Sequence, residues 1–137
     1  MKIAVLLKQV PDLAEELEVD DSGKALDTEY IKFRLNEYDE HALEEAVCLK
    51  EAGEATEVTA IALDGEEVDK ALFTAMAKGA DKALKLTGTG AEGSRNAAAF
   101  FSEALDSEYD LIMTGVQSVD DREGMMGPML SAMLKIP

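Results

Sequence analysis

The sequence is poor in the residues that form covalent cross-links, metal sites and catalytic centres. Its 137 residues include one cysteine, Cys48, and one histidine, His41. A single cysteine excludes an intramolecular disulfide and is typical of a reducing compartment. Both side chains fall on one expected helix, about 10 Å apart along its axis, which is too far to share a metal ion. No Ser-His-Asp or Cys-His arrangement can be assembled, so the sequence favours a binding protein over an enzyme.

Positive charge is also scarce. The chain carries 13 lysine and arginine residues against 29 aspartate and glutamate residues, a formal net charge of −16. Such a field repels nucleic acids and anionic membrane surfaces, so we exclude both as partners. Salt adaptation, a positively charged partner and simple drift each explain the acidity, and we favour salt adaptation. Any anionic cofactor has to be bound mainly by backbone dipoles.

Long apolar runs are absent. No run approaches the roughly 18 residues that a membrane span needs, so we expect no membrane insertion. The first twelve residues lack the small-residue cleavage site of a signal peptide and predict a β-strand instead. The length is typical of one domain, which we place at residues 1–137 and expect in the cytoplasm.

What the sequence does contain is a regular alternation of strand-like and helix-like segments. The alternation predicts an α/β fold, a doubly wound parallel sheet with helices on both faces and right-handed crossovers. A strong turn at Asp20–Gly23 predicts a small β-hairpin insertion after the first strand, pairing Glu16–Val19 with Lys24–Asp27. The predicted strands are Lys2–Leu7, Glu57–Leu63, Lys82–Leu86 and Leu111–Thr114, and the predicted helices are Tyr38–Ala52, Glu66–Lys78, Ser94–Leu105 (with Ser94 as its N-cap) and Pro128–Leu134.

The loop after the last strand is the stretch most suited to a ligand. In a sheet of order 3-2-1-4 the winding direction reverses between the first and fourth strands, and ligands bind at such switch points. The two loops there are Lys8–Asp12 and Gly115–Gly127. Gly124–Gly127 opens the last helix, and free N–H groups at a helix N-terminus form an anion cradle. The alternative is an ordinary βα turn, in which glycine only permits a positive φ.

Two further clusters have both a functional and an ordinary explanation. Asp120, Asp121 and Glu123 could suggest a Mg²⁺ site, but a chance cluster is at least as frequent among 29 acidic residues. Four methionines form a stripe on the last helix, for which core packing is the default. The alternative is that Met125 and Met126, the first two of the stripe, approach a flat aromatic ligand; Met129 and Met133 complete it.

Four segments together resemble the β subunit of electron transfer flavoprotein. They are Val5–Asp12, Leu35–Ala46, Ala75–Asp81 and the last loop with Gly115–Asp120 and Gly127-Pro128. The resemblance implies an adenine nucleotide alpha hydrolase-like sheet. Because that subunit is longer, we expect a C-terminally truncated fragment that ends before a fifth strand. The exposed edge of the fourth strand would then let the fragment self-associate.

The resemblance implies an electron carrier rather than an enzyme. Such a β subunit pairs with an α subunit and carries electrons between flavin dehydrogenases and a quinone-linked acceptor. Its own pocket holds AMP in ordinary members and a second FAD in electron-bifurcating members. Carried over by position, the pocket residues are Leu6, Leu7, Asn36, Ala62, Leu63, Gly115, Asp120, Asp121, Gly124, Met125, Met126 and Gly127.

Two positions depart from the family pattern, and two other functions remain open. Met125-Met126 replaces a glutamine followed by threonine or valine, which removes a polar side-chain contact to phosphate. Asp121-Arg122 replaces Gly-Asp, and Arg122 offers a phosphate contact of its own. The alternatives are a stand-alone adenine-nucleotide-binding module of the stress-protein type, and a degenerate scaffold that only dimerises.

Overall fold

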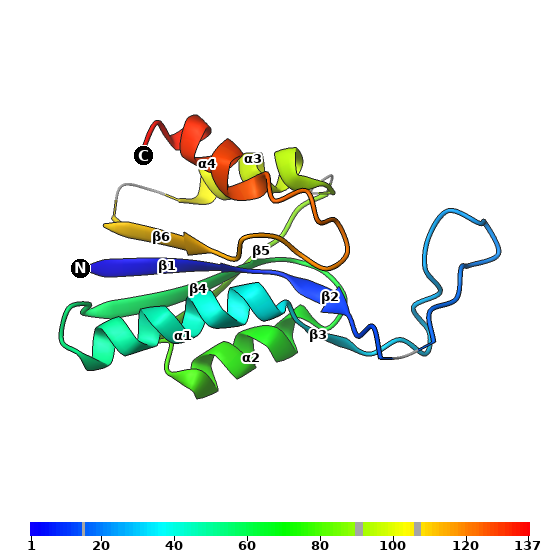
Figure 1. The fold of residues 1–137 in the computed structure, drawn as a ribbon, viewed down its shortest axis with the longest axis horizontal. Coiled ribbons are helices and arrows are strands. Elements are labelled where there is room, and N and C mark those ends of the chain that lie inside the picture. Colours follow the sequence, from blue (N-terminus) through cyan, green and yellow to red (C-terminus); the bar gives the residue numbers. More distant parts are fainter. Residues whose placement is uncertain (15, 90–91, 106–107) are drawn as a thin grey trace.

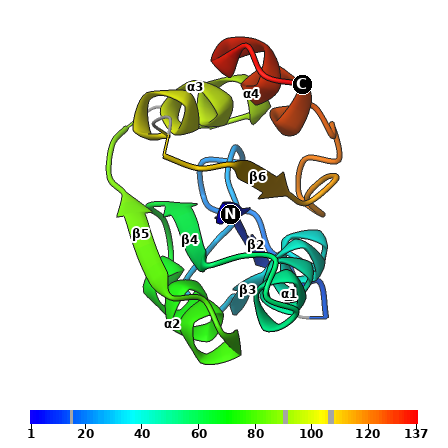
Figure 2. The ribbon, with the colours of Figure 1, turned by 90° about the vertical axis from the view of Figure 1, so that its left-hand side faces the viewer.

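The predicted α/β architecture is confirmed by a computed structural model, which describes residues 1–14, 16–89, 92–105 and 108–137. A parallel four-stranded sheet is covered by two helices on each face, α1 and α2 on one and α3 and α4 on the other (Figures 1 and 2). The elements are β1 (Lys2–Leu7), β2 (Gln9–Pro11), β3 (Phe33–Leu35), α1 (Glu37–Glu51), β4 (Glu57–Leu63), α2 (Val68–Lys78), β5 (Lys82–Leu86), α3 (Ser94–Ala104), β6 (Leu111–Thr114) and α4 (Met126–Leu134).

The sheet is built around β1. Its observed order is β5-β4-β1-β6, so the first strand pairs in parallel with β4 on one side and β6 on the other. Ile3, for example, lies opposite Val58 of β4 and Leu111 of β6. The carboxyl ends of β1 and β6 therefore lie next to each other, and their following loops leave the sheet on the same edge.

The apolar run of β1 serves both faces of the sheet. Ile3, Val5 and Leu7 belong to the core beneath α1 and α2, whereas Ala4 and Leu6 belong to the core beneath α3 and α4. Alternate side chains of a strand point to opposite faces, so a strand buried on both faces needs apolar residues at every position. This is why the sequence of β1 shows no alternation.

The four predicted strands of this sheet have the predicted bounds, whereas three of the helix starts differ. α2 begins at Val68 because Glu67 adopts a left-handed conformation, with a φ of 56°, and cannot be its first helical residue. α4 begins at Met126, two residues before the predicted start, so Pro128 lies inside the first turn, where proline is tolerated. α1 begins at Glu37, one residue early.

The prediction that Ser94 caps α3 is wrong. Gly93 occupies the cap position and no side chain caps the helix. Ser94 is the first helical residue and is buried, and its hydroxyl is directed to Oδ2 of Asp121 in the last loop, 3.4 Å away, instead of to the free N–H groups of its own helix.

The predicted hairpin is reduced to one isolated bridge between Val19 and Leu26. The segment that contains it extends away from the body of the molecule (Figure 1), and a short antiparallel ladder of β2 and β3 closes its base. Pro11 forms part of this ladder, opposite Phe33. The backbone of Asn36 donates to Lys8, and that of Asp12 donates to Lys32. Hydrogen-bonded and non-hydrogen-bonded pairs alternate along an antiparallel ladder, so Pro11 lies at a non-hydrogen-bonded position, where its missing N–H is not needed.

β6 lies at one edge of the four-stranded sheet and is only half-buried along its length. The partial exposure follows from its position, because a strand at an edge has one neighbour and incomplete helical cover. Self-association through this edge stays a prediction.

Candidate nucleotide site

One cavity of about 600 Å³ opens at the carboxyl ends of the parallel strands. A volume of this size is typical of small-molecule and cofactor pockets. Besides the two predicted loops, the cavity is lined by the loop after β4, including Asp64 and Glu66, and by the loop after β5, including Glu92. Eleven of the twelve residues carried over from the family line it: Leu6, Leu7, Asn36, Leu63, Gly115, Asp120, Asp121, Gly124, Met125, Met126 and Gly127.

Ala62 is the one predicted residue that does not line the cavity. Its side chain is 1% exposed and packs in the core beneath α1 and α2. Its neighbour Leu63 is on the opposite face of β4 and lines the cavity. The strand alternation separates the two residues, and the sequence alone left the phase of that alternation open.

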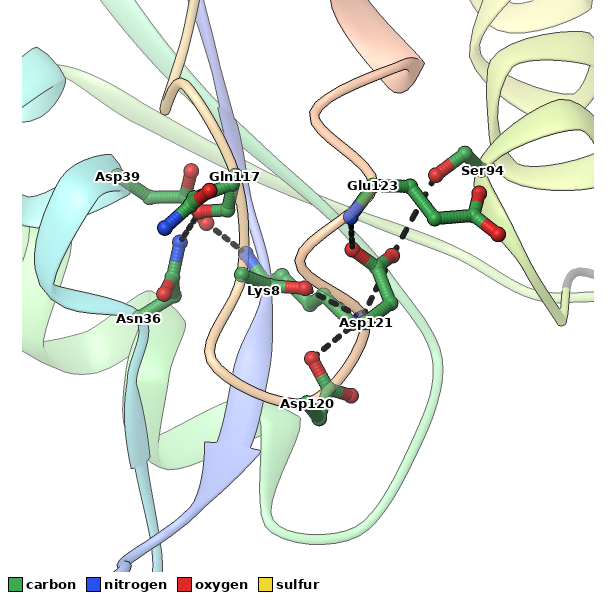
Figure 3. Close-up of polar contacts among 9 residues, drawn as sticks. Lys8, Asn36, Asp39, Ser94, Gln117, Asp120, Asp121 and Glu123 are labelled. Carbon is green, nitrogen blue, oxygen red and sulfur yellow. Dashed lines mark hydrogen bonds and ion pairs between the residues drawn. The ribbon is translucent and has the colours of Figure 1, made fainter.

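Asp39 joins the two loops of the switch point. It lies in the first turn of α1, where one carboxylate oxygen accepts the N–H of Lys8 at 2.8 Å and the other accepts the N–H of Gly115 at 2.9 Å. The carboxylate thus holds the residue after β1 and the residue after β6 at the same helix end. Figure 3 shows its contact with Lys8. We call this arrangement the Asp39 clamp.

The clamp places a carboxylate in a poorly solvated position. Asp39 is 5% exposed. Burial disfavours the charged form and raises the pKa of Asp39 to about 6, although the two accepted N–H bonds and the charge of Lys8 act in the opposite direction. Asp39 is therefore mainly ionised at neutral pH and titrates in mildly acidic solution.

Gly115 allows β6 to end against α1. A Cβ atom at this position would lie 2.2 Å from Oδ1 of Asp39 and 2.8 Å from its backbone nitrogen. Both distances are far below a van der Waals contact. The glycine is thus required by close approach of the two segments, since its φ is not positive.

Asn36, the residue before α1, is buried and lines the cavity. Its Nδ2 donates to the backbone oxygen of Gln117 at 2.8 Å, which fixes the last loop to the start of the helix. Its Oδ1 is buried and has no hydrogen-bond partner among the described residues, and the same holds for Oε1 of Gln9. Both oxygens are enclosed by the surrounding protein, so the missing partner is a cost within the fold and identifies no group of a ligand.

Lys8 ties the last loop to the end of β1. Its Nζ donates to Oγ of Ser118 at 2.9 Å and to Oδ1 of Asp120 at 2.8 Å, and it lies 3.5 Å from Oδ2 of Asp121. Burial raises the pKa of Asp120, but the hydrogen bonds from Lys8 and Ser118 and the charge of Lys8 outweigh it and hold the pKa below the ordinary value. Asp120 and Asp121 thus both form ion pairs with Lys8.

The acidic cluster of the last loop is organised by these internal contacts. Asp121 accepts the N–H of Glu123 at 3.1 Å, and the Ser94 hydroxyl lies 3.4 Å from its other oxygen (Figure 3). No group of three or more His, Cys, Asp and Glu side chains arranged to hold a metal ion occurs in the described part of the chain. His41 and Cys48 are both exposed on α1.

The start of α4 provides the expected backbone donors. Met126 and Gly127 are its first two residues, so their N–H groups have no partner within the helix. Gly124, with a φ of 63°, turns the chain into this position. The methionine stripe contributes to the core and to the cavity. Met126 and Met129 pack against the core, and Met125 and Met126 line the cavity.

The sequence pattern identified the last loop but missed the residues that hold it. Lys8, Asp39 and Ser118 were not selected, because each has an ordinary explanation in its local segment. Two signals were present: Lys8 is a cation directly after a buried strand, and Asp39 follows Asn36 by the spacing at which a capping residue and an acidic first-turn residue occur.

The fold and this cavity define a doubly wound α/β protein with a ligand-sized site at the switch point of its sheet. Within the described ranges, no helix combines the length and apolar character needed to cross a membrane. The profile of the electron transfer flavoprotein domain matches residues 24–137. The chain therefore belongs to the electron transfer flavoprotein family.

Its relatives are β subunits of that family. Electron transfer flavoprotein subunit beta of Methylophilus methylotrophus is 33% identical over 141 residues, covering 100% of this chain and 53% of that protein. The Bradyrhizobium diazoefficiens protein of the same name is 32% identical over 135 residues, covering 98% and 54%. The Bacillus subtilis protein is 35% identical over 142 residues, covering 100% and 54%. The chain thus spans about half the length of the curated relatives that it matches.

Proposed function

We propose that this chain is the nucleotide-binding part of an electron transfer flavoprotein β subunit that binds AMP or FAD in the switch-point cavity. With an α subunit it would carry electrons between flavin dehydrogenases and a quinone-linked acceptor, as a carrier and not an enzyme. The observation that carries the proposal is the cavity itself, since eleven residues transferred from the family by position line it together. A cytoplasmic location belongs to the same proposal.

The residues present fit an adenine nucleotide. The free N–H groups of Met126 and Gly127 suit a phosphate, because the start of a helix carries partial positive charge. Asn36 and Gln9 contribute uncharged polar side chains to the lining. When FAD is the ligand, its isoalloxazine supplies the redox chemistry, whereas AMP supplies none. The protein contributes the binding, the orientation and the shape of the site.

The pocket is tested by Gly127→Val. A Cβ atom at Gly127 would lie 3.2 Å from Oγ1 of Thr114, and the rest of the valine side chain would occupy space at the helix start. We expect the fold to remain and the affinity for AMP or FAD to fall at least about tenfold, which corresponds to about 1.4 kcal/mol. Isothermal calorimetry measures the affinity.

Ala132→Val is the matched control, because Ala132 is exposed on the same helix and does not line the cavity. It should bind like the parent. Equal affinity of Gly127→Val and the parent would remove this loop from the site.

The partner is tested by co-expression with an α subunit from the same source. We expect a yellow complex that elutes as one species in size exclusion, with the flavin absorption following the protein peak. A colourless chain that binds adenine nucleotides without an α subunit would favour the stand-alone module instead.

A further inference from the structure

The Asp39 clamp joins the two loops of the switch point through one ionisable group. Asp39 accepts the N–H of Lys8 at 2.8 Å and that of Gly115 at 2.9 Å, so the ends of β1 and β6 share its carboxylate. Gly115 approaches so closely that a Cβ atom there would lie 2.2 Å from Oδ1 of Asp39. The spacing of the two loops therefore depends on the charge of this carboxylate.

The sheet holds the two loops with different firmness. β1 pairs with β4 on one side and with β6 on the other, so the backbone that leads to Lys8 is fixed from both sides. β6 lies at an edge of the described sheet, pairs with β1 and is half-buried. When the clamp opens, the segment that moves is therefore the end of β6 together with the last loop.

The other contacts between the last loop and the rest of the fold do not include a buried charge. Nζ of Lys8 lies 2.8 Å from Oδ1 of Asp120, and the two side chains are 45% and 35% exposed, so this ion pair contributes little. Asn36 donates to the backbone oxygen of Gln117 at 2.8 Å (Figure 3). Among the described residues, Asp39 is the buried charged side chain, and its protonation state has the largest effect on the loop.

The charges around the clamp compensate the buried carboxylate only in part. From the loop after β1 it faces Lys8, whose Nζ is already engaged by Asp120 and Asp121 of the last loop. The four residues of β6, Leu111–Thr114, are uncharged. Burial therefore outweighs the hydrogen bonds to Asp39 and the charge of Lys8, and the pKa of Asp39 rises to about 6.

The remaining ionisable groups near the start of α1 belong to the helix itself and to the elements beside it. On α1 they are Glu37, Tyr38, Glu40 and His41. From α2, Lys78 pairs with Glu40 at 3.1 Å, and from β3, Arg34 lies 3.9 Å from Asp12. Glu57 of β4 is at the other end of the sheet, opposite Lys2. These neighbours are paired elsewhere or exposed, and the buried group that changes charge is Asp39.

We infer that Asp39 is a proton-dependent positioning residue, which holds the last loop closed against α1 when it is protonated and favours an open loop when it is ionised. An ionised carboxylate gains hydration when the loop moves away, whereas a neutral carboxyl group gains much less. The closed arrangement thus binds the proton more tightly than an open one in which water reaches Asp39. By linkage, mildly acidic solution favours the closed arrangement.

The test is native-state hydrogen exchange of the Gly115 amide, followed by NMR between pH 5 and pH 7.5 and corrected for the intrinsic exchange rate. This N–H donates to Asp39, so it exchanges when the clamp opens. With a pKa of about 6 in the closed arrangement and 3.8 in the open one, the protection factor should fall roughly tenfold as the pH rises over this range. A protection factor that stays constant or rises with pH would overturn the inference.

The amide of Val5 shows whether the opening is local. Val5 lies in the centre of β1 and is fully buried, so its amide exchanges when the whole sheet unfolds. We expect Gly115 to be less protected than Val5 at every pH. Equal protection of the two amides would mean that the clamp opens only with the whole fold, and would also overturn the inference.

Asp39→Asn removes the titrating group and keeps the size of the side chain, so the pH dependence of Gly115 protection should disappear. His41→Gln is the matched control, because histidine is the side chain that ordinarily titrates near neutral pH and this one is two residues away on the same helix, where side chains do not face each other. It should keep the full pH dependence. A dependence that survives in Asp39→Asn, or disappears in His41→Gln, would remove Asp39 from this role. Since all these measurements use the chain without a ligand, their outcome leaves the proposed function untouched.

Discussion

Gly115→Ala is expected to lower the free energy of unfolding by about 3 kcal/mol, the upper part of the range for over-packed positions. The new Cβ atom would lie 2.2 Å from Oδ1 of Asp39, 2.8 Å from its backbone nitrogen and 2.9 Å from the carbonyl carbon of Tyr38. Two of these atoms belong to the backbone of α1, so a rotation of one side chain cannot relieve the contact. Either β6 or α1 has to move.

The shift also breaks the Asp39 clamp. If the carboxylate moves away, the N–H groups of Lys8 and Gly115 lose their acceptor, which adds the cost of unpaired donors. Thermal unfolding followed by circular dichroism should show a decrease of roughly 10 °C in the midpoint for a domain of this size. Nucleotide affinity should fall as well, because the two loops of the cavity separate.

Gly65→Ala is the matched control for this substitution. Gly65 also lines the cavity, but a Cβ atom there would meet nothing within 4 Å and its φ is not positive. Its midpoint should stay within about 2 °C of the parent, or rise slightly because alanine restricts the unfolded chain. A Gly115→Ala midpoint as close to the parent as this would show that the two segments do not need their tight approach.

Asp39 is expected to give a pH dependence of stability opposite to that of a usual carboxylate. Its pKa in the folded protein, about 6, lies above the unfolded value of 3.8. Between these values the folded state binds more protons than the unfolded state, so the contribution of Asp39 to the free energy of unfolding falls as the pH rises. Over the whole window the change is about 3 kcal/mol.

Asp39→Asn isolates this contribution. The asparagine does not titrate, so the stability of the parent minus that of the variant should decrease by about 2.5 kcal/mol between pH 4 and pH 7. Urea unfolding at a series of pH values measures the difference. A difference that stays constant would show that Asp39 titrates normally, and one that rises with pH would show that the hydrogen bonds outweigh burial.

Asp120→Asn provides the comparison with opposite sign. Lys8 and Ser118 hold the pKa of Asp120 below its ordinary value, so its contribution is complete above the unfolded pKa and is lost as the pH falls below it. The parent-minus-variant difference should therefore be flat between pH 5 and pH 7 in this variant, whereas that of Asp39→Asn still falls over this range.

The strands of the main sheet could be predicted from the sequence because their signal is local. Parallel strands buried on both faces are uninterrupted apolar runs, and Glu57–Leu63 could hardly form another element between its flanking turns. The helix starts were harder. Glu67 is the last residue before α2, and Gly93 is the last residue before α3. In each case a single backbone angle decides whether the residue belongs to the loop or to the helix, and several residue types adopt both conformations.

The sequence predicts which loops form the site, but not which side chains contact each other there. The strand-to-helix transitions located the switch point, because the carboxyl ends of parallel strands share one edge. The role of Asp39 could not be predicted, since an acidic residue in a first helical turn is already explained by the helix dipole. Only the packing of two distant strand ends against that turn buries the carboxylate and gives it two backbone donors.

The central position of β1 has a consequence for the rate at which the chain folds. Lys2, at the start of β1, is 108 residues from Asp110, with which it bonds beside β6, whereas Met1 is 55 residues from its partner Thr56 beside β4. Closing the longer loop, between β1 and β6, costs more chain entropy than closing the loop between β1 and β4, and this cost precedes the stabilising contacts. The strand made first is thus completed late, and contacts of this sequence separation are typical of slow folding. Until β6 pairs with β1, that edge of the first strand keeps unpaired N–H and C=O groups, and such an edge favours association with another chain.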